Sequence, residues 1–303
     1  MTFKTRAAIR SMRLRTLPLS LAGVMLGILL AASDFKVSPW TALLIILTTI
    51  LLQILSNLSN DLGDVLKGTD TEDRQGPSYG LEEGGLTIED MKHMIMIVCL
   101  LCAVSGIIMI WVSFGSLFCT SSLCLLVLGA AAIAGAMRYT LGKNPYGYRG
   151  LGDLFVFLFF GLVAVLGAYF VSAHTVPGWL LLLPASGIGF FSIGVLNVNN
   201  IRDMKTDSAN RTTVALMLGL RRARIYQTVL IVLGWACMVT YCLMRFFDPW
   251  HYLFVITLPL YVLHLRGVWT REDRALDPML PLLVLSTFAL ALLMGFGFVK
   301  FLL

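Results

Sequence analysis

Two clusters of aspartate and asparagine residues stand out in a chain that is otherwise strongly apolar. The first reads NLSNDLGDVLKGTDTEDR and begins at residue 57. If this segment is helical, Asn57, Asp61 and Asp64 stand at positions i, i+4 and i+7 and therefore share one face. Carboxylates on one helical face repel one another, so this arrangement requires a compensating positive charge.

The second cluster reads NNIRDMKTD and begins at residue 199. Its Asn199, Asp203 and Asp207 stand at i, i+4 and i+8, which again predicts one shared helical face. Mg²⁺ binds carboxylate oxygens and leaves coordination positions for water and phosphate oxygens. Two facing clusters therefore predict a site that holds more than one Mg²⁺ and clamps a diphosphate.

The candidate residues follow from these two clusters. The predicted magnesium ligands are the aspartates Asp61, Asp64, Asp70, Asp203 and Asp207. The predicted substrate-binding groups are the amides Asn57, Asn60, Asn199 and Asn200, and the cations Arg74, Arg202, Lys205 and Arg211, which would neutralise phosphate charge. The alternative is a solvated loop whose acids balance neighbouring bases. Two matched clusters at equivalent positions favour the metal site.

The elements that position these clusters are predicted to be membrane-spanning helices. Hydrophobic residues make up 58% of the chain and charged residues only 13%, about half the charge of a soluble domain. A helix needs roughly 20 apolar residues to cross the hydrocarbon layer. Nine runs qualify, approximately at 17–33, 39–57, 94–112, 118–137, 154–172, 179–198, 226–244, 250–265 and 280–299. They predict an all-α membrane protein with a single domain over residues 1–303.

The charges predict the orientation of these spans. With nine spans, 20 of the 23 Lys and Arg residues lie on one side of the membrane, and positive residues concentrate in cytoplasmic loops. Fifteen of the 17 acids lie on the same side, including both clusters. We therefore expect a protein of the bacterial inner membrane with its N-terminus and active site facing the cytoplasm. No nucleic-acid partner is expected.

The positions of the clusters also predict an internal repeat. Each cluster closes an even-numbered span, and four spans separate them. Two four-helix units plus a ninth helix would place the clusters opposite each other across a central cavity. An isoprenyl diphosphate suits such a cavity, because its charged head would meet the metals while its tail lies among the helices or in lipid.

Other classes of function remain possible at this point. A transporter usually has ionisable groups near the middle of its spans, whereas here no acid lies in the middle of a span and all but two lie at the cytoplasmic ends. A non-catalytic prenyl-lipid binding protein fits two complete clusters poorly. A lipid head-group phosphotransferase usually has glycine after the second aspartate of its DxxD pair, and here Val65 follows Asp64.

The clusters resemble the two aspartate-rich motifs of the UbiA superfamily of intramembrane prenyltransferases. The NDxxD motif of that family appears at residues 60–64, and its NxxRDxxxD motif at residues 199–207. The resemblance covers nearly the whole chain and implies nine transmembrane helices and Mg²⁺-dependent prenyl transfer. Many relatives continue with Gly-Lys-x-Thr, whereas this chain has NRTT at residues 210–213, so that Arg211 keeps the positive charge.

Several segments look closer still to the 1,4-dihydroxy-2-naphthoate polyprenyltransferases of menaquinone biosynthesis. They are RLRTLP at 13–18, NDLGDVLKGTD at 60–70, RQGP at 74–77, GGLT at 84–87 and YTLGKNPYGYRGLGD at 139–153. The third aspartate of the first motif is Asp70, as in the naphthoate enzymes, while hydroxybenzoate-type relatives have it at the position of Gly68.

This resemblance implies a reaction and further site residues. Polyprenyl diphosphate would ionise, the naphthoate ring would attack at its carboxyl-bearing carbon, and loss of CO₂ would give demethylmenaquinone. Tyr139 and Lys143 would line the site near the cation and diphosphate, and Arg13 or Arg15 would face the acid substrate. An alternative for Tyr139 is an interfacial aromatic residue. Other acceptors remain open, such as 4-hydroxybenzoate, homogentisate or a haem.

The remaining reactive residue types receive no catalytic role from the sequence. Asp153 stands four residues after Arg149, which favours a surface ion pair over a catalytic base. The six cysteines all lie in or beside apolar spans, which favours small packed side chains. The four histidines lie near span ends, and nothing in the sequence pairs them with a nucleophile.

Overall fold

The computed structural model describes residues 3–67, 80–81, 84–207, 211–245 and 248–299. Within these residues, nine helical segments are long and apolar enough to cross a membrane. They are Phe3–Asp34, Pro39–Lys67, Ile88–Phe114, Thr120–Arg138, Gly152–Ala173, Trp179–Arg202, Leu220–Met244, Pro249–Thr270 and Asp273–Phe298. Each contains one of the nine predicted spans almost completely, so the prediction of a nine-span, all-α membrane protein is confirmed.

Several of these segments are built from more than one helix. The helices are α1 (Phe3–Ser11), α2 (Leu17–Asp34), α3 (Pro39–Lys67), α4 (Ile88–Phe114), α5 (Thr120–Arg138), α6 (Gly152–Val156), α7 (Ala164–Ala173), α8 (Leu182–Arg202), α9 (Met204–Asp207), α10 (Val214–Leu218), α11 (Leu220–Met244), α12 (Leu258–Thr270) and α13 (Met279–Phe298). The π-helix Phe157–Val163 joins α6 to α7. The 3-10 helix Pro249–Thr257 precedes α12.

Local capping chemistry sets the ends of α4. Thr87 and Asp90 form a reciprocal capping box, in which each side chain accepts a hydrogen bond from the backbone N–H of the other residue. At the other end Gly115 adopts φ 69°, a left-handed conformation that glycine reaches without strain. The helix therefore begins six residues before the apolar run that predicts it at 94–112.

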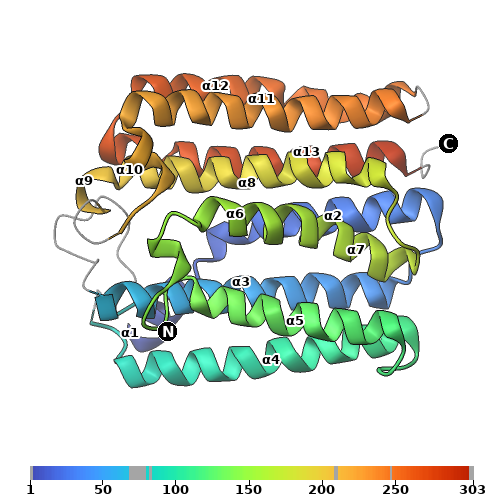
Figure 1. Cartoon of the computed structure of the whole chain (residues 1–303), viewed down its shortest axis with the longest axis horizontal. Coiled ribbons are helices and arrows are strands. Elements are labelled where there is room, and N and C mark those ends of the chain that lie inside the picture. Colours follow the sequence, from blue (N-terminus) through green and yellow to red (C-terminus); the bar gives the residue numbers. More distant parts are fainter. Residues whose placement is uncertain (1–2, 68–79, 82–83, 208–210, 246–247, 300–303) are drawn as a thin grey trace.

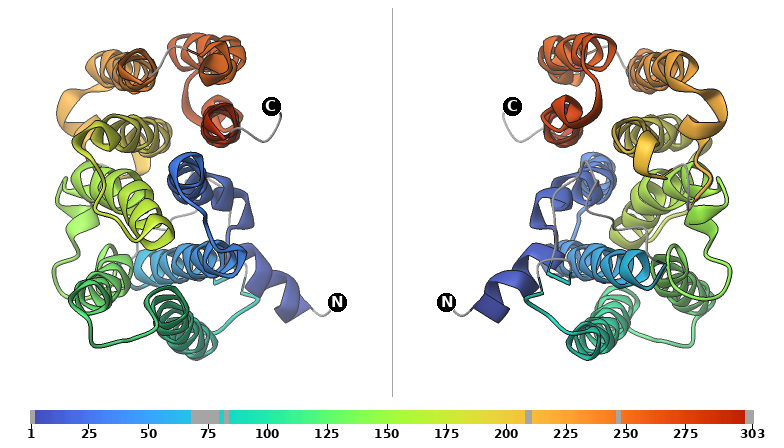
Figure 2. Two further views of the ribbon diagram at one scale, coloured as in Figure 1. Left: turned by 90° about the vertical axis from the view of Figure 1, so that its right-hand side faces the viewer. Right: turned by 90° about the vertical axis from the view of Figure 1, so that its left-hand side faces the viewer.

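The packing of the helices follows the predicted repeat. The most extensive helix contacts are α3 with α4 and α8 with α11, which are the second and third spans of the two units. The first spans of the two units also pack together, as α2 against α7. The ninth span, α13, contacts α2, α8 and α12. Figure 1 shows the resulting stack of helices, and Figure 2 shows it viewed along the spans.

The two ends of the molecule differ in charge and in structure. Helices α1, α9 and α10 all lie at one end, while α13 finishes at the other (Figure 1). At the far end Arg245 donates a hydrogen bond of 2.9 Å to Asp34, so two of the few charges there form an ion pair. Both aspartate clusters lie at the end that carries α1.

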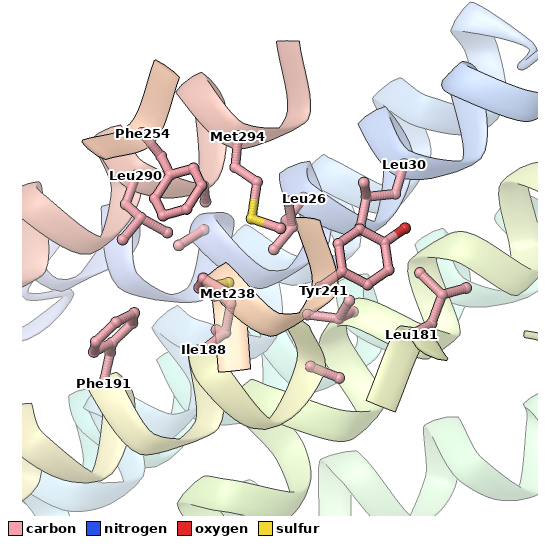
Figure 3. Close-up of a cluster of buried hydrophobic side chains, with 14 of the residues drawn as sticks. Leu26, Leu30, Leu181, Ile188, Phe191, Met238, Tyr241, Phe254, Leu290 and Met294 are labelled. Atoms are coloured by element: carbon pink, nitrogen blue, oxygen red, sulfur yellow. The ribbon is translucent and has the colours of Figure 1, made fainter. Parts of the chain in front are cut away.

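The second helical unit is solidly packed. Its largest hydrophobic cluster joins α8, α11, α12 and α13 to α2, and Phe191, Tyr241 and Tyr261 are among its fully buried side chains. Figure 3 shows Phe191 and Tyr241 among the side chains of this cluster that lie between the helices. The first unit is different, because α5 faces its neighbours with small residues of the segment GAAAIAGA at 129–136. The cavity of the protein consequently lies in the first unit and the fifth span.

Candidate active site

The first aspartate cluster lies on a continuous helix, as its spacing predicts. Helix α3 continues to Lys67, and Asn57, Asp61 and Asp64 are all buried. Asp61 is 0% exposed and Asp64 is 4% exposed. Burial of two carboxylates on one face, three residues apart, requires strong compensation from hydrogen bonds or cations.

The second cluster is not a continuous helix, and this part of the prediction is wrong. Helix α8 ends at Arg202, and Asp203 leaves the helical conformation with φ −93° and ψ 9°. The hydrogen bonds between residues four apart are nevertheless preserved. The backbone N–H of Asp203 donates to the backbone carbonyl of Asn199, and the backbone N–H of Asp207 donates to that of Asp203. Both aspartates are buried, at 2% and 4% exposed.

Hydroxyl groups from distant segments hold the first pair of carboxylates. The Ser11 hydroxyl at the end of α1 donates to Asp61 over 2.5 Å and accepts a bond of 3.1 Å from the amide of Gly80. The Tyr148 hydroxyl donates to Asp64 over 2.6 Å. Neither hydroxyl was expected from the sequence, because the partners are 50 and 84 residues apart.

Arg202 holds the first carboxylate of the second cluster. Its guanidinium forms two bonds to Asp203, of 2.8 and 2.6 Å, and one of 2.7 Å to Asp277. A fourth bond of 3.0 Å reaches the side-chain oxygen of Asn199. The side chains of Arg202 and Asp203 are each 3% exposed. All these contacts are with protein groups, so in this arrangement Arg202 orients Asp203.

Arg211 joins the two clusters electrostatically. It forms an ion pair of 2.8 Å with Asp207 and lies over the ring of Tyr148 at 5.6 Å. Burial acts to lower the pKa of Arg211, but Asp207 and Asp64 outweigh it and raise the pKa above its ordinary value. Burial raises the pKa of Asp207 from 3.8 to about 6, Arg211 opposes the rise, and Asp203 and Asp64 add to it. Carboxylates of both clusters therefore interact in one site.

Of the other predicted residues, three asparagines are buried or half-buried, whereas three of four cations are exposed. Asn57 donates to the carbonyl of Met12 and to the Thr16 hydroxyl, over 2.8 and 3.0 Å, and so anchors the segment before α2. Asn60, half-buried, accepts from the Thr140 hydroxyl, and Asn200 is buried beside Arg211. Arg13 is half-buried, whereas Arg15, Lys143 and Lys205 are exposed, the last paired with Asp273. Asp70 and Arg74 lie outside the described residues.

An apolar cavity of about 590 Å³ opens beside the first cluster. It is lined by α2, α3, α4, α5 and the fifth span, and by Leu196 as its only residue from α8. Asn57, Asn60 and Tyr139 are among its few polar residues. The cavity therefore has an apolar interior and carries polar side chains where it meets Asn57 and Asn60 of the first cluster.

The π-helix shapes one wall of this cavity. Phe155, Phe159, Val163, Gly167 and Val171 all line it, at intervals of four residues. In a regular α-helix at 3.6 residues per turn, residues 155 and 171 would point about 160° apart. The wider turn of the π-helix Phe157–Val163 brings them back to one face.

Tyr139 separates this large cavity from a small polar pocket. Only Tyr139 and Leu196 line both spaces; the pocket also contains Asp153, Asn200 and Arg211. Burial raises the pKa of Tyr139 to about 12, with Arg211 opposing this and Asp64 and Asp153 adding to it. The tyrosine is therefore a half-buried, neutral side chain in contact with the site. Asp153 is also buried and accepts from the Tyr226 hydroxyl over 2.9 Å, so the predicted surface ion pair with Arg149 is wrong.

The carboxylates fit a hard divalent cation with additional ligands from a second molecule. Among the described residues, no three acidic, histidine or cysteine side chains lie close enough to hold a cation by themselves. Each cluster instead presents two carboxylates. Oδ2 of Asp207 is buried and has no hydrogen-bond partner among the described groups, which costs free energy unless a cation or proton meets it. Such a donor set suits Mg²⁺ shared with water and phosphate oxygens.

Several known proteins are similar to this chain in sequence or in fold. The model of the UbiA prenyltransferase family matches residues 20–283. The 1,4-dihydroxy-2-naphthoate octaprenyltransferase of Escherichia coli is 39% identical over 280 residues, which are 91% of this chain and 90% of that protein.

Two solved structures share the fold at 15% identity. The apo structure of a UbiA homolog from Aeropyrum pernix superposes with a TM-score of 0.70 over 95% of this chain and 98% of the other. A UbiA homolog from Archaeoglobus fulgidus bound to DMAPP and Mg²⁺ superposes with a TM-score of 0.62, over 97% and 99%. The match to the family model covers most of the chain, including both aspartate clusters, and the chain therefore belongs to the UbiA prenyltransferase family.

Proposed function

We propose that this enzyme transfers a polyprenyl group from polyprenyl diphosphate to 1,4-dihydroxy-2-naphthoate, with release of diphosphate and CO₂, to give demethylmenaquinol, the reduced form of demethylmenaquinone. The observation that carries the proposal is that buried aspartates of two segments interact in one site, while Asn57 and Asn60 of the first cluster line an apolar cavity beside it. This placement suits a substrate with a charged head and a long apolar tail. The naphthoate acceptor is supported by the name of the Escherichia coli relative.

Asp61, Asp64, Asp203 and Asp207 would hold Mg²⁺, as the DMAPP and Mg²⁺ in the structure from Archaeoglobus fulgidus support. Bound there, Mg²⁺ would draw electrons from the diphosphate and favour its departure from the allylic carbon. Arg211 would neutralise phosphate charge, because it already interacts with one carboxylate of each cluster, Asp207 and Asp64. The tail would lie along the wall formed by the π-helix and α5, which excludes water from the allylic cation.

We further propose that the protein lies in a bacterial inner membrane with this site facing the cytoplasm. The excess of positive residues at the end that carries both clusters supports this orientation. A cysteine placed at exposed Lys143 would then react with a membrane-impermeant maleimide only in inverted vesicles. Labelling of that cysteine in intact, right-side-out vesicles would refute the orientation.

The direct test supplies purified enzyme with Mg²⁺, 1,4-dihydroxy-2-naphthoate and a polyprenyl diphosphate. We expect a prenylated naphthoquinol, identified by mass, and we expect EDTA to abolish turnover until Mg²⁺ is restored. In parallel reactions 4-hydroxybenzoate replaces the naphthoate. Turnover of hydroxybenzoate without any turnover of the naphthoate would overturn the proposed acceptor but not the metal site.

Replacement of Ser11 by alanine is expected to weaken magnesium binding. The Ser11 hydroxyl orients the Asp61 carboxylate, and loss of a group that orients a metal ligand typically costs about 10–100-fold in metal affinity. The measurement is the Mg²⁺ concentration that gives half-maximal turnover. Ser286→Ala is the matched control, because it removes a buried hydroxyl that bonds only to the carbonyl of Leu282. An unchanged Mg²⁺ requirement in Ser11→Ala would count against this role.

Filling the cavity is expected to discriminate between short and long prenyl donors. Ala132 on α5 lines the cavity, so Ala132→Phe should slow turnover of a long polyprenyl diphosphate by about 10-fold or more, equivalent to about 1.4 kcal/mol. Turnover of dimethylallyl diphosphate should fall much less, because its tail occupies little of the cavity. Ala134→Phe is the control, since Ala134 is exposed and does not line the cavity. Equal loss with both donors would argue against this cavity as the tail site.

A further inference from the structure

Asp153 is a buried carboxylate beside the reaction site that the metal-binding clusters do not use. It lies in the first turn of the fifth span, is 9% exposed, and accepts a side-chain hydrogen bond from Tyr226 of α11. No described Lys or Arg forms an ion pair with it. A buried carboxylate with one donor and no paired cation is costly, which suggests a function.

The small polar pocket connects Asp153 to Tyr139. Both side chains line it, together with Asn200 and Arg211. The contact is close: a Cβ atom on Gly152, the residue before Asp153, would lie 3.1 Å from the Tyr139 hydroxyl oxygen. The pocket volume is about 10 Å³, close to the minimum that holds one water molecule. A proton can therefore pass between Tyr139 and Asp153 through one water.

Tyr139 is in turn the link to the large cavity. It lines that cavity beside Asn60, and its hydroxyl forms no hydrogen bond with any described residue. Its ring is held in place by an edge-on contact with Tyr146, with ring centroids 5.3 Å apart, and by the backbone of Gly147. Tyr139 thus has a fixed ring and an available hydroxyl between the place of the substrate and Asp153.

We propose that Tyr139 and Asp153 form a proton relay that removes the proton of an acceptor hydroxyl during prenyl transfer. The inference rests on the proposed function and adds to it the route of the proton. Tyr139 contacts the acceptor directly. Asp153 does not contact the acceptor and acts only through Tyr139, so it is a positioning residue. Asn200 and Arg211 complete the polar walls of the pocket.

The step balances without an external reactant. The acceptor O–H bond breaks, its proton passes to the Tyr139 oxygen, and the tyrosine proton passes to Asp153. The ring oxygen supplies electrons to the carboxyl-bearing carbon, which bonds to the allylic carbon as diphosphate leaves with the electrons of its C–O bond. The bond to the carboxylate then breaks, CO₂ leaves, the electrons return to the ring oxygen, and Asp153 returns the proton through Tyr139.

The test separates ionisation of the donor from attack by the acceptor. Asp153→Asn keeps the size of the side chain and an acceptor oxygen for Tyr226, but it cannot take up the proton. We expect product formation to fall by about 10²–10⁴-fold, the usual contribution of a general base. Release of diphosphate in a reaction without acceptor should be unchanged. Tyr139→Phe should give the same pattern and replaces Asp153→Asn if that variant does not fold.

An acidic acceptor provides the readout that a merely structural role would not change. An analogue with an electron-withdrawing ring substituent needs less help to lose its proton, so it should restore much of the rate in Asp153→Asn. The acidic acceptor should not restore the rate of Asp61→Asn, because in that variant the prenyl diphosphate itself does not ionise. Arg149→Gln is the control for loss of an exposed nearby charge, and its turnover should equal that of the wild type.

The outcomes distinguish the relay from the proposed function. Wild-type enzyme that forms no prenylated naphthoate would refute the proposed function itself. Wild-type turnover together with normal turnover in Asp153→Asn and Tyr139→Phe would refute only the relay. Equal loss of diphosphate release and product formation, without rescue by the acidic acceptor, would also refute it, because the residues would then serve donor binding or folding.

Discussion

Replacement of Asp61 or Asp203 by asparagine is expected to reduce prenyl transfer by at least about 10²–10³-fold, the cost of losing one transition-state stabilising group. Asparagine preserves the size of each side chain and removes its charge. Each carboxylate already has protein donors, Ser11 for Asp61 and Arg202 for Asp203. Loss of the negative charge would weaken the binding of Mg²⁺ at that carboxylate. The measurement is the rate of product formation at saturating Mg²⁺ and at tenfold higher Mg²⁺.

The matched control is Asp273→Asn. Asp273 lies at the same end of the molecule but is 39% exposed in its side chain and pairs with exposed Lys205. We expect its turnover to stay close to that of the wild type, and we expect circular dichroism to show unchanged helix content in all three variants. Near-normal turnover in either Asp61→Asn or Asp203→Asn would remove the basis of the two-cluster metal site.

The spans were predictable because the thickness of the hydrocarbon layer sets the minimum length of an apolar run that can cross it. Hydropathy, however, reports only the part of a helix that lies in hydrocarbon. Helix α3 continues to Lys67, ten residues beyond the predicted end at residue 57, and α4 starts early at its capping box. The π-helix has no sequence signal at all, since its residues are as apolar as those of any regular span.

The site was predictable where its chemistry is local. The aspartates of each cluster are neighbours in sequence, so their spacing alone places them together. Their partners are not: Ser11, Tyr148 and Tyr226 reach carboxylates 50, 84 and 73 residues away. The sequence spacing of four residues also did not reveal that α8 ends at Arg202, because one hydrogen-bonded turn after the helix keeps the same spacing. The contrast between exposed Arg149 and buried Asp153 likewise arises from tertiary packing.

Replacement of Arg202 by alanine is expected to give the largest loss of stability among the charged residues of the site. It would leave Asp203, 3% exposed, without its cation, and would also remove the partner of Asp277. Removing one member of a buried ion pair typically costs about 3–5 kcal/mol, because the other charge remains buried and unpaired. Arg202→Lys should recover only part of this, since an ammonium group cannot form the two parallel bonds that Arg202 makes to Asp203.

The thermal unfolding midpoint of the purified protein, in one detergent or lipid throughout, measures this effect. Lys205→Ala is the matched control, because its ion pair with Asp273 lies three residues away and is exposed, and such pairs contribute about 0–1 kcal/mol. We expect the unfolding midpoint of Arg202→Ala to lie well below that of the wild type, and the midpoint of Lys205→Ala to stay close to it. Equal midpoints for the two variants would mean that water or a bound cation reaches Asp203, and that its carboxylate does not depend on Arg202 for compensation.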